Sequence, residues 1–126
     1  MYVYPDPSGR ARKTSAAVGV TDFSILQSAG LNVLAKSKAP PIVDSVACVN
    51  RKLKNAAGDI DVFVRPECKG VIQSLERTAW VDKNPDLAVI DKSEGVEHFS
   101  DGIRYLFDHR FPIRAGAKVT ARGFGF

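Results

Sequence analysis

Two acidic side chains near opposite ends of this chain have the residue type and the surroundings that metal chemistry needs. Asp101 lies within the segment Glu97–Tyr105, whose pattern predicts the first turns of an amphipathic helix after a glycine-marked loop. Asp6 follows the short apolar run Tyr2–Tyr4, which predicts a strand. Carboxylates held on rigid elements are the hard oxygen ligands that Mg²⁺ prefers, and a pair of them suits phosphodiester chemistry.

Each acid also has a simpler interpretation. Asp6 stands between Pro5 and Pro7, where an aspartate commonly organises a turn through its own side chain. Asp101 falls on the side of the predicted helix away from its apolar stripe, so a solvated face explains it, and the helix dipole favours an acid near the N-terminus. The metal interpretation of Asp101 requires that this face border a cleft.

The elements that would position these acids alternate between strands and helices. The predicted order begins with a strand over 2–4, a helix capped by Asp22 and ended by Gly30, a strand over 31–34 and a helix from Ile42 to Leu53. It continues with a strand over 60–64, a helix opened by Pro66, a short extended piece at 80–81, an apolar run over 87–90 and a helix over 96–109. This alternation predicts an α/β layered domain with ligands beyond the carboxyl ends of the strands, where Asp6 lies.

The last predicted helix has its apolar stripe at five positions, which are expected to face the core. They are Val96, Phe99, Ile103, Leu106 and Phe107. The chain has no Gly-x-x-x-x-Gly-Lys sequence, so a phosphate-binding loop of that type is not predicted.

Bulk composition predicts one globular domain. The chain has 126 residues, of which 44% are hydrophobic and 25% charged. No run approaches the roughly 20 apolar residues of a membrane span, and the first residues lack a secretory pattern. We therefore expect a cytoplasmic protein that does not enter a membrane.

Cys48 and Cys68 form no Cys-x-x-Cys motif and fall on apolar helical faces, which predicts buried free thiols.

The net charge of +4 is unevenly distributed. One basic cluster, Arg10, Arg12 and Lys13, directly follows Asp6, and the C-terminal tail carries further arginines and lysine without an acid after Asp108. Such patches attract polyanions in a salt-dependent way. The alternative is a solvated loop and a frayed tail.

From Tyr2 to Pro112 the order of features resembles the C-terminal nuclease domain of bacteriophage terminase large subunits. Three segments carry the resemblance: residues 3–9, which look like that family's second acidic strand; residues 64–70 with Leu75, Glu76 and Trp80, which look like its late strand and helix; and residues 90–92 with His98-x-x-Asp101-x-x-Arg104-Tyr105, which look like its final motif.

The resemblance implies a ribonuclease H-like fold, a layered mixed sheet with flanking helices, spanning residues 1–113 and followed by a basic tail at 114–126. It implies metal-dependent cleavage of double-stranded DNA during phage genome packaging, in the cytoplasm of the bacterial host. Asp6 and Asp101 would bind Mg²⁺ or Mn²⁺ and Lys92 would approach the scissile phosphate. The residues expected to contact DNA are Arg10, Arg12, Lys13, Lys92, His98 and Arg114, and the packaging portal and small terminase subunit are expected partners.

The chain departs from the family in one respect. Family members place another essential aspartate on an earlier strand, and this chain begins too late to contain it. The resemblance therefore implies an incomplete domain whose exposed sheet edges favour association of the chain with itself as a homo-oligomer. Asp59 and Asp61 are alternative third ligands, although both precede their predicted strand instead of ending it. A catalytically inactive prophage remnant that binds DNA or packaging proteins, and an unrelated small α/β binding protein, are the alternative functions.

Three further residues have competing interpretations. His98 would orient Asp101 or contact phosphate, but a capping or surface histidine is equally consistent with its position. The role of Lys92 depends on the resemblance, because a lysine in a loop is ordinarily solvated. Trp80 is expected to pack in the core and not to stack on bases, since no other aromatic residue extends such a surface.

Overall fold

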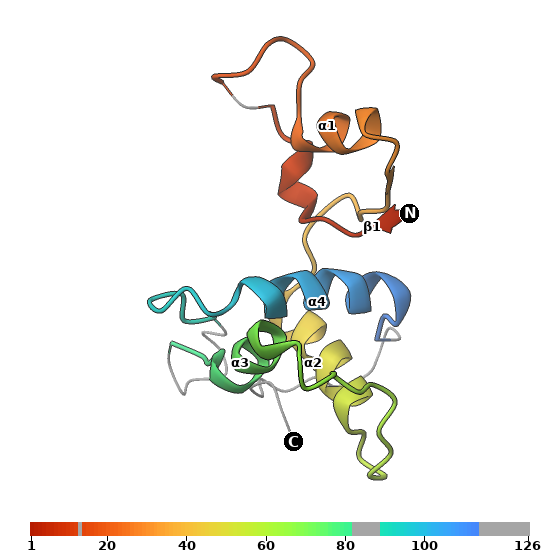
Figure 1. Ribbon diagram of the computed structural model, residues 1–126, viewed down its shortest axis with the longest axis vertical. Coiled ribbons are helices and arrows are strands. Elements are labelled where there is room, and N and C mark those ends of the chain that lie inside the picture. The colour runs from red at the N-terminus through yellow and green to blue at the C-terminus, as the bar shows by residue number, and fades with distance from the viewer. Residues whose placement is uncertain (13, 82–88, 114–126) are drawn as a thin grey trace.

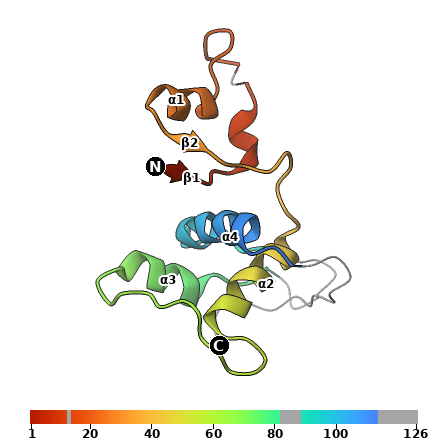
Figure 2. The same ribbon diagram turned by 90° about the vertical axis from the view of Figure 1, so that its right-hand side faces the viewer.

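The computed structural model describes residues 1–12, 14–81 and 89–113. These residues form two lobes, which Figures 1 and 2 show above and below one long helix, α4 (His98–Arg110). The N-terminal lobe consists of the described residues before position 36. The helical lobe contains α2 (Ile42–Leu53) and α3 (Lys69–Arg77), and both pack against α4.

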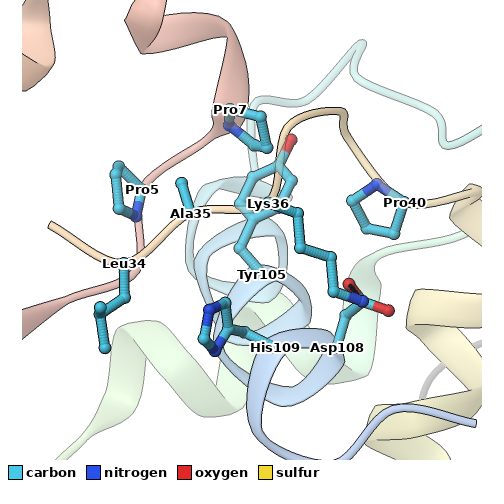
Figure 3. Close-up of a pocket in the computed structure, with 9 residues that line it drawn as sticks. All are labelled: Pro5, Pro7, Leu34, Ala35, Lys36, Pro40, Tyr105, Asp108 and His109. Atoms are coloured by element: carbon cyan, nitrogen blue, oxygen red, sulfur yellow. Dashed lines mark ion pairs between the residues drawn. The ribbon is translucent and has the colours of Figure 1, made fainter.

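The N-terminal lobe is a small strand, helix, strand unit, as the sequence predicts. Strands β1 (Tyr2–Val3) and β2 (Asn32–Val33) pair in parallel, with Tyr2 opposite Asn32. A 3₁₀ helix, η1 (Pro7–Arg10), and helix α1 (Asp22–Ser28) connect them. Beyond the carboxyl ends of both strands the chain reaches α4 (Figure 3).

Helix α1 is held by local hydrogen bonds and one buried aromatic ring. Its N-cap is Thr21 and not Asp22, because Thr21 and Ser24 form a reciprocal capping box, with Oγ1 accepting from the Ser24 N–H at 3.0 Å. Phe23 is 7% exposed. The Arg10 guanidinium lies 5.5 Å from the centre of the Phe23 ring. A side chain at Gly9 would lie 3.0 Å from that ring, so glycine allows the close approach of η1.

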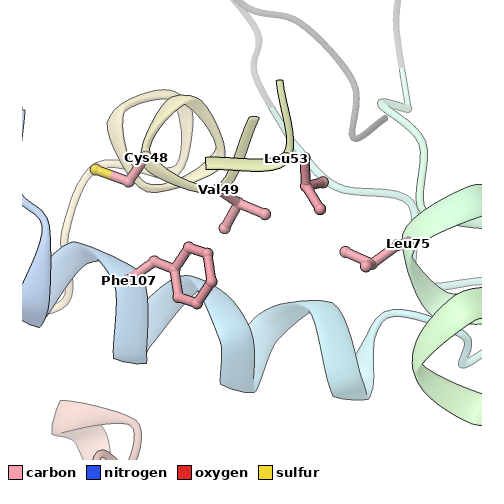
Figure 4. Close-up of a cluster of buried hydrophobic side chains, with 5 residues drawn as sticks. All are labelled: Cys48, Val49, Leu53, Leu75 and Phe107. Atoms are coloured by element: carbon pink, nitrogen blue, oxygen red, sulfur yellow. The ribbon is translucent and has the colours of Figure 1, made fainter. Parts of the chain in front are cut away.

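The helical lobe contains the apolar core. Helix α2 begins after Pro41, and its buried face packs against α4. The core side chains, drawn in Figure 4, are Cys48, Val49, Leu53, Leu75 and Phe107. Their spacing on α2 is the helical period that the sequence predicts. Cys48 is a buried free thiol as expected, whereas the prediction for Cys68 is wrong: its thiol is exposed at the N-cap of α3, before the packed turns of that helix begin.

Two predicted elements between α2 and α3 differ from the structure. Residues 60–64 form no strand among the described residues, because no neighbouring segment pairs with them. Helix α3 begins at Lys69 and not at Pro66, because a turn closed by the Cys68 N–H and the Arg65 carbonyl, 2.9 Å apart, precedes it. The extended piece at Trp80 does form, as an antiparallel bridge to Ile90.

Helix α4 lies between the two lobes, and the set of its buried residues differs from the predicted apolar stripe. Phe107 is in the core, and Ile103 and Leu106 pack against it, as expected. Phe99, predicted to face the core, is 56% exposed, because the apolar cluster lies against the C-terminal part of the helix. The buried polar residues on α4 are Ser100, Arg104 and Asp108.

The fold is mixed α and β, with four α-helices and two short parallel strands in the part of the chain that the structure describes. Among those residues, none of the helices combines the length and apolar character that crossing a membrane demands.

Candidate functional site on helix α4

Helix α4 turns a polar face toward the N-terminal lobe. Asp101, Tyr105 and His109 are spaced at i, i+4 and i+8, so they follow one another along one side of the helix. The segments that follow β1 and β2 lie over this face. Together with Tyr105, Asp108 and His109 they line a small surface pocket of about 10 Å³ (Figure 3), which is space for one water molecule and not for a substrate.

Asp6 reaches this face through a hydrogen bond to Tyr105. The Tyr105 hydroxyl donates to Asp6 Oδ2 at 2.8 Å, although the two residues are 99 positions apart. The other carboxylate oxygen caps η1 by accepting from the Ser8 N–H at 2.8 Å. The turn role and the approach to α4, considered as alternatives from the sequence, therefore occur together.

The hydrogen bond changes the acidity of both partners. Partial desolvation would raise the pKa of Asp6, but the Ser8 N–H, the Tyr105 hydroxyl and the charge of Arg104 outweigh it, so the pKa is lowered. Desolvation and the bond to Asp6 raise the pKa of Tyr105 to about 12. At neutral pH the pair is therefore a carboxylate that accepts from a neutral phenol.

Asp101, one helical turn before Tyr105, is held by two cations. Arg104 donates to Asp101 Oδ1 from Nη2 at 2.7 Å and from Nε at 3.1 Å. Lys92 Nζ donates to Asp101 Oδ2 at 3.2 Å. Arg104 is 4% exposed, and its remaining Nη1 donates to Ser45 Oγ on α2 at 2.7 Å. The carboxylate of Asp101 thus neutralises a buried guanidinium.

Three of the residues singled out from the sequence lie along this side of α4. Lys92 contacts Asp101, and Asp6 contacts the residue one turn further along α4. His98 does not join them, because its side chain is 79% exposed and its Nδ1 lies 3.8 Å from Glu97. This is the surface histidine of the alternative interpretation.

The expected DNA-contacting residues are only partly described. Arg10 and Arg12 are exposed in the N-terminal lobe, on the chain segment that follows Asp6. Lys13 and Arg114, with the rest of the tail at 114–126, lie outside the described residues. The exposed arginines keep the charge that a phosphate backbone requires.

Sequence reasoning missed a second polar contact between the lobes. Lys36, just after β2, pairs with Asp108 at 2.5 Å, and the Asp108 side chain is 8% exposed. Next to it the His109 ring lies edge-on to Tyr4, with ring centres 5.2 Å apart. The His109 Nδ1 is buried and has no hydrogen-bond partner among the residues that the structure describes. In the sequence, His109 follows Asp101 and Tyr105 at intervals of four residues. This spacing predicts that the three side chains share one face of the helix, but it does not predict which residues contact that face.

The oxygen chemistry of Asp6 and Asp101 fits a divalent cation such as Mg²⁺ or Mn²⁺. No cluster of three or more histidine, cysteine or acidic side chains suited to a metal is present within the described ranges. Asp59 and Asp61, weighed as a third ligand, interact instead with Asn55 and Lys52.

Comparison of the chain with protein-family models, curated proteins and solved structures finds no match. The resemblance to the terminase nuclease accordingly stays a prediction from the sequence.

Proposed function

We propose that this chain is part of a metal-dependent endonuclease domain of the terminase type, with a ribonuclease H-like fold, which cuts double-stranded DNA during phage genome packaging. The observation that supports it is the hydrogen bond between Asp6 and Tyr105, because it brings an acid beyond the end of β1 to the helical face that carries Asp101. Acids contributed by a strand end and a facing helix are a suitable arrangement for binding catalytic metals.

In this proposal Asp6 and Asp101 bind Mg²⁺ or Mn²⁺. A bound metal of this kind activates water and stabilises the leaving oxygen of a phosphodiester. Lys92, which is 63% exposed and contacts Asp101, is free to turn toward a phosphate. Arg10 and Arg12 contact the DNA backbone without reading its sequence.

A second candidate function is a catalytically inactive fragment that binds DNA or packaging proteins. A specific observation favours it: the acids already have protein partners. Arg104 and Lys92 occupy the oxygens of Asp101, and Ser8 and Tyr105 occupy those of Asp6. A metal would have to compete with a buried guanidinium for Asp101.

The experiment is a nicking assay on supercoiled plasmid with Mn²⁺. The unchanged chain is expected to nick the plasmid, and Asp6→Asn or Asp101→Asn to abolish nicking while keeping the side-chain shape. Glu76→Gln, which removes an exposed acid on α3, is the matched control and is expected to remain active. Circular dichroism at the assay temperature confirms that each variant is folded.

Each outcome distinguishes the two functions. Nicking that persists in both aspartate variants would exclude the proposed site. Salt-dependent retention on DNA without any nicking would support the inactive fragment. The absence of both retention and nicking would exclude the nuclease and a fragment that binds DNA.

A further inference from the structure

Residues 60–64 keep the burial pattern of a strand although they lack a pairing partner. Val62 and Val64 pack against the core cluster, whereas Asp61, Phe63 and Arg65 are exposed. This alternation is the period of a half-buried strand, and the β-branched and aromatic residues favour that conformation.

The backbone of this segment is unpaired. Among the described residues, Asp61 donates its N–H to the Lys52 carbonyl and Cys68 donates to Arg65, but the N–H and carbonyl groups of Val62–Val64 make no hydrogen bond. A β-prone segment with free backbone groups is a site where another strand can add.

The surface beside the segment is apolar and hollowed. A cavity of about 340 Å³ lies between residues 60–64 and α3. Phe63 at its wall is 82% exposed, and Ile60 is 43% exposed. An exposed phenylalanine beside an apolar hollow is unusual for a surface that only water covers.

We propose that residues 61–65 pair with the same residues of a second copy, as antiparallel strands related by a two-fold axis at Phe63. This register places Val62 opposite Val64 and Asp61 opposite Arg65 of the other copy. Both charge pairs are then complementary, and the two Phe63 rings meet at the axis above the apolar hollows. Cross-strand aromatic and opposite-charge pairs stabilise such an arrangement.

The backbone hydrogen bonds of the preceding turn favour this register over one centred on Val62. A pairing centred on Val62 would place Asp61 opposite Phe63 and Arg65 opposite Asp59, whose N–H and carbonyl are already bonded to Asn55. Within the described residues, Arg65 pairs with the exposed Glu67 at 3.3 Å, and Asp61, whose side chain is 51% exposed, pairs with Lys52 at 2.8 Å. Ion pairs at the surface contribute little, so both charges can exchange these partners for those of a second copy. Pro66 ends the paired segment because it has no N–H to donate.

The inference is independent of the nuclease proposal and is tested by molar mass. Light scattering after size exclusion is expected to show the 13.7 kDa chain forming dimers as its concentration rises. Phe63→Asp is expected to weaken the dimer by about tenfold or more, because it places two like charges at the axis. Val18→Asp changes a residue that is 85% exposed in the other lobe and is expected to leave the dimer intact.

Charge reversal and crosslinking test the register. Asp61→Arg is expected to weaken the dimer, and the double change Asp61→Arg with Arg65→Asp to restore it. In a Cys68→Ser background, Phe63→Cys is expected to form an intermolecular disulfide on oxidation, whereas Arg65→Cys, which lies away from the axis, is not.

A chain that stays monomeric up to its highest soluble concentration would overturn the proposal. A dimer that Phe63→Asp leaves unchanged would overturn it too, because another face would then form the contact. Failure of the double charge change to restore the dimer, or crosslinking at Arg65→Cys alone, would refute the register.

Discussion

The two lobes are stabilised by different physical means. The helical lobe contains the apolar cluster around Val49 and Phe107, drawn from three helices. The described residues of the N-terminal lobe include one buried aromatic side chain, Phe23, together with two-residue strands and a capping box. It contacts α4 through polar groups, as in the pair of Asp6 and Tyr105.

This difference places the candidate site at the boundary between a well-packed lobe and a weakly packed one. Asp101 is on α4, which the apolar core holds, and Asp6 is on a turn that local hydrogen bonds hold. Regions with few buried apolar contacts open at lower free energy. We therefore expect the distance between the two acids to depend on the N-terminal lobe.

The largest effect is expected from the helical core. Phe107→Ala should destabilise the chain by about 3–5 kcal/mol, because it leaves a cavity among α2, α3 and α4. Denaturant unfolding followed by circular dichroism measures it. Phe99→Ala makes the same change on the same helix at a residue 56% exposed, and should cost far less. Equal effects would show that the cluster is not the core.

A smaller but substantial effect is expected from the charge at the lobe boundary. Asp101→Asn should destabilise the chain by about 3 kcal/mol, because it leaves the buried Arg104 guanidinium without its anion. Glu67→Gln, which breaks the exposed pair with Arg65, should cost less than about 0.5 kcal/mol. Equal, small losses in the same unfolding experiment would show that Arg104 is not desolvated.

The smallest effect is expected from the contact between the lobes. Tyr105→Phe should cost about 1 kcal/mol at neutral pH, the value of one hydrogen bond. Hydrogen exchange should report the loss in β1, β2 and α1 and not in α2. Tyr2→Phe, at an exposed tyrosine, is the control and should change neither measurement.

The pH dependence follows from the shifted acidities of this pair. The pKa of Asp6 is lowered, so its contribution is present above its ordinary value and is lost as the pH falls through the lower folded value. The pKa of Tyr105 is raised to about 12, so its contribution is complete below the ordinary tyrosine value and is lost as the pH rises through about 12. The cost of Tyr105→Phe should therefore be greatest between these limits, and a constant cost into acid would contradict the bond to ionised Asp6.

Local sequence signals determined most of the elements. Proline at position 41, the helical spacing from Ile42 to Leu53 and the strand, helix, strand order of the first 34 residues are predictable because they depend on neighbouring residues. The β-branched and aromatic residues at 60–64 predicted a strand, and the alternating burial of Val62 and Val64 is that of a strand. The missing strand shows that a pattern sets the face of a segment and not its partner.

Only the tertiary structure decided what surrounds the acids. The sequence singled out Asp6, Lys92 and Asp101, but not that a buried Arg104 binds Asp101 or that Tyr105 binds Asp6. The sequence also did not predict the ion pair between Lys36 and Asp108 at the same boundary between the lobes. The reason is physical: residue type and spacing determine which side of a helix a group occupies, whereas its charge partners depend on segments that only folding brings within a few ångströms.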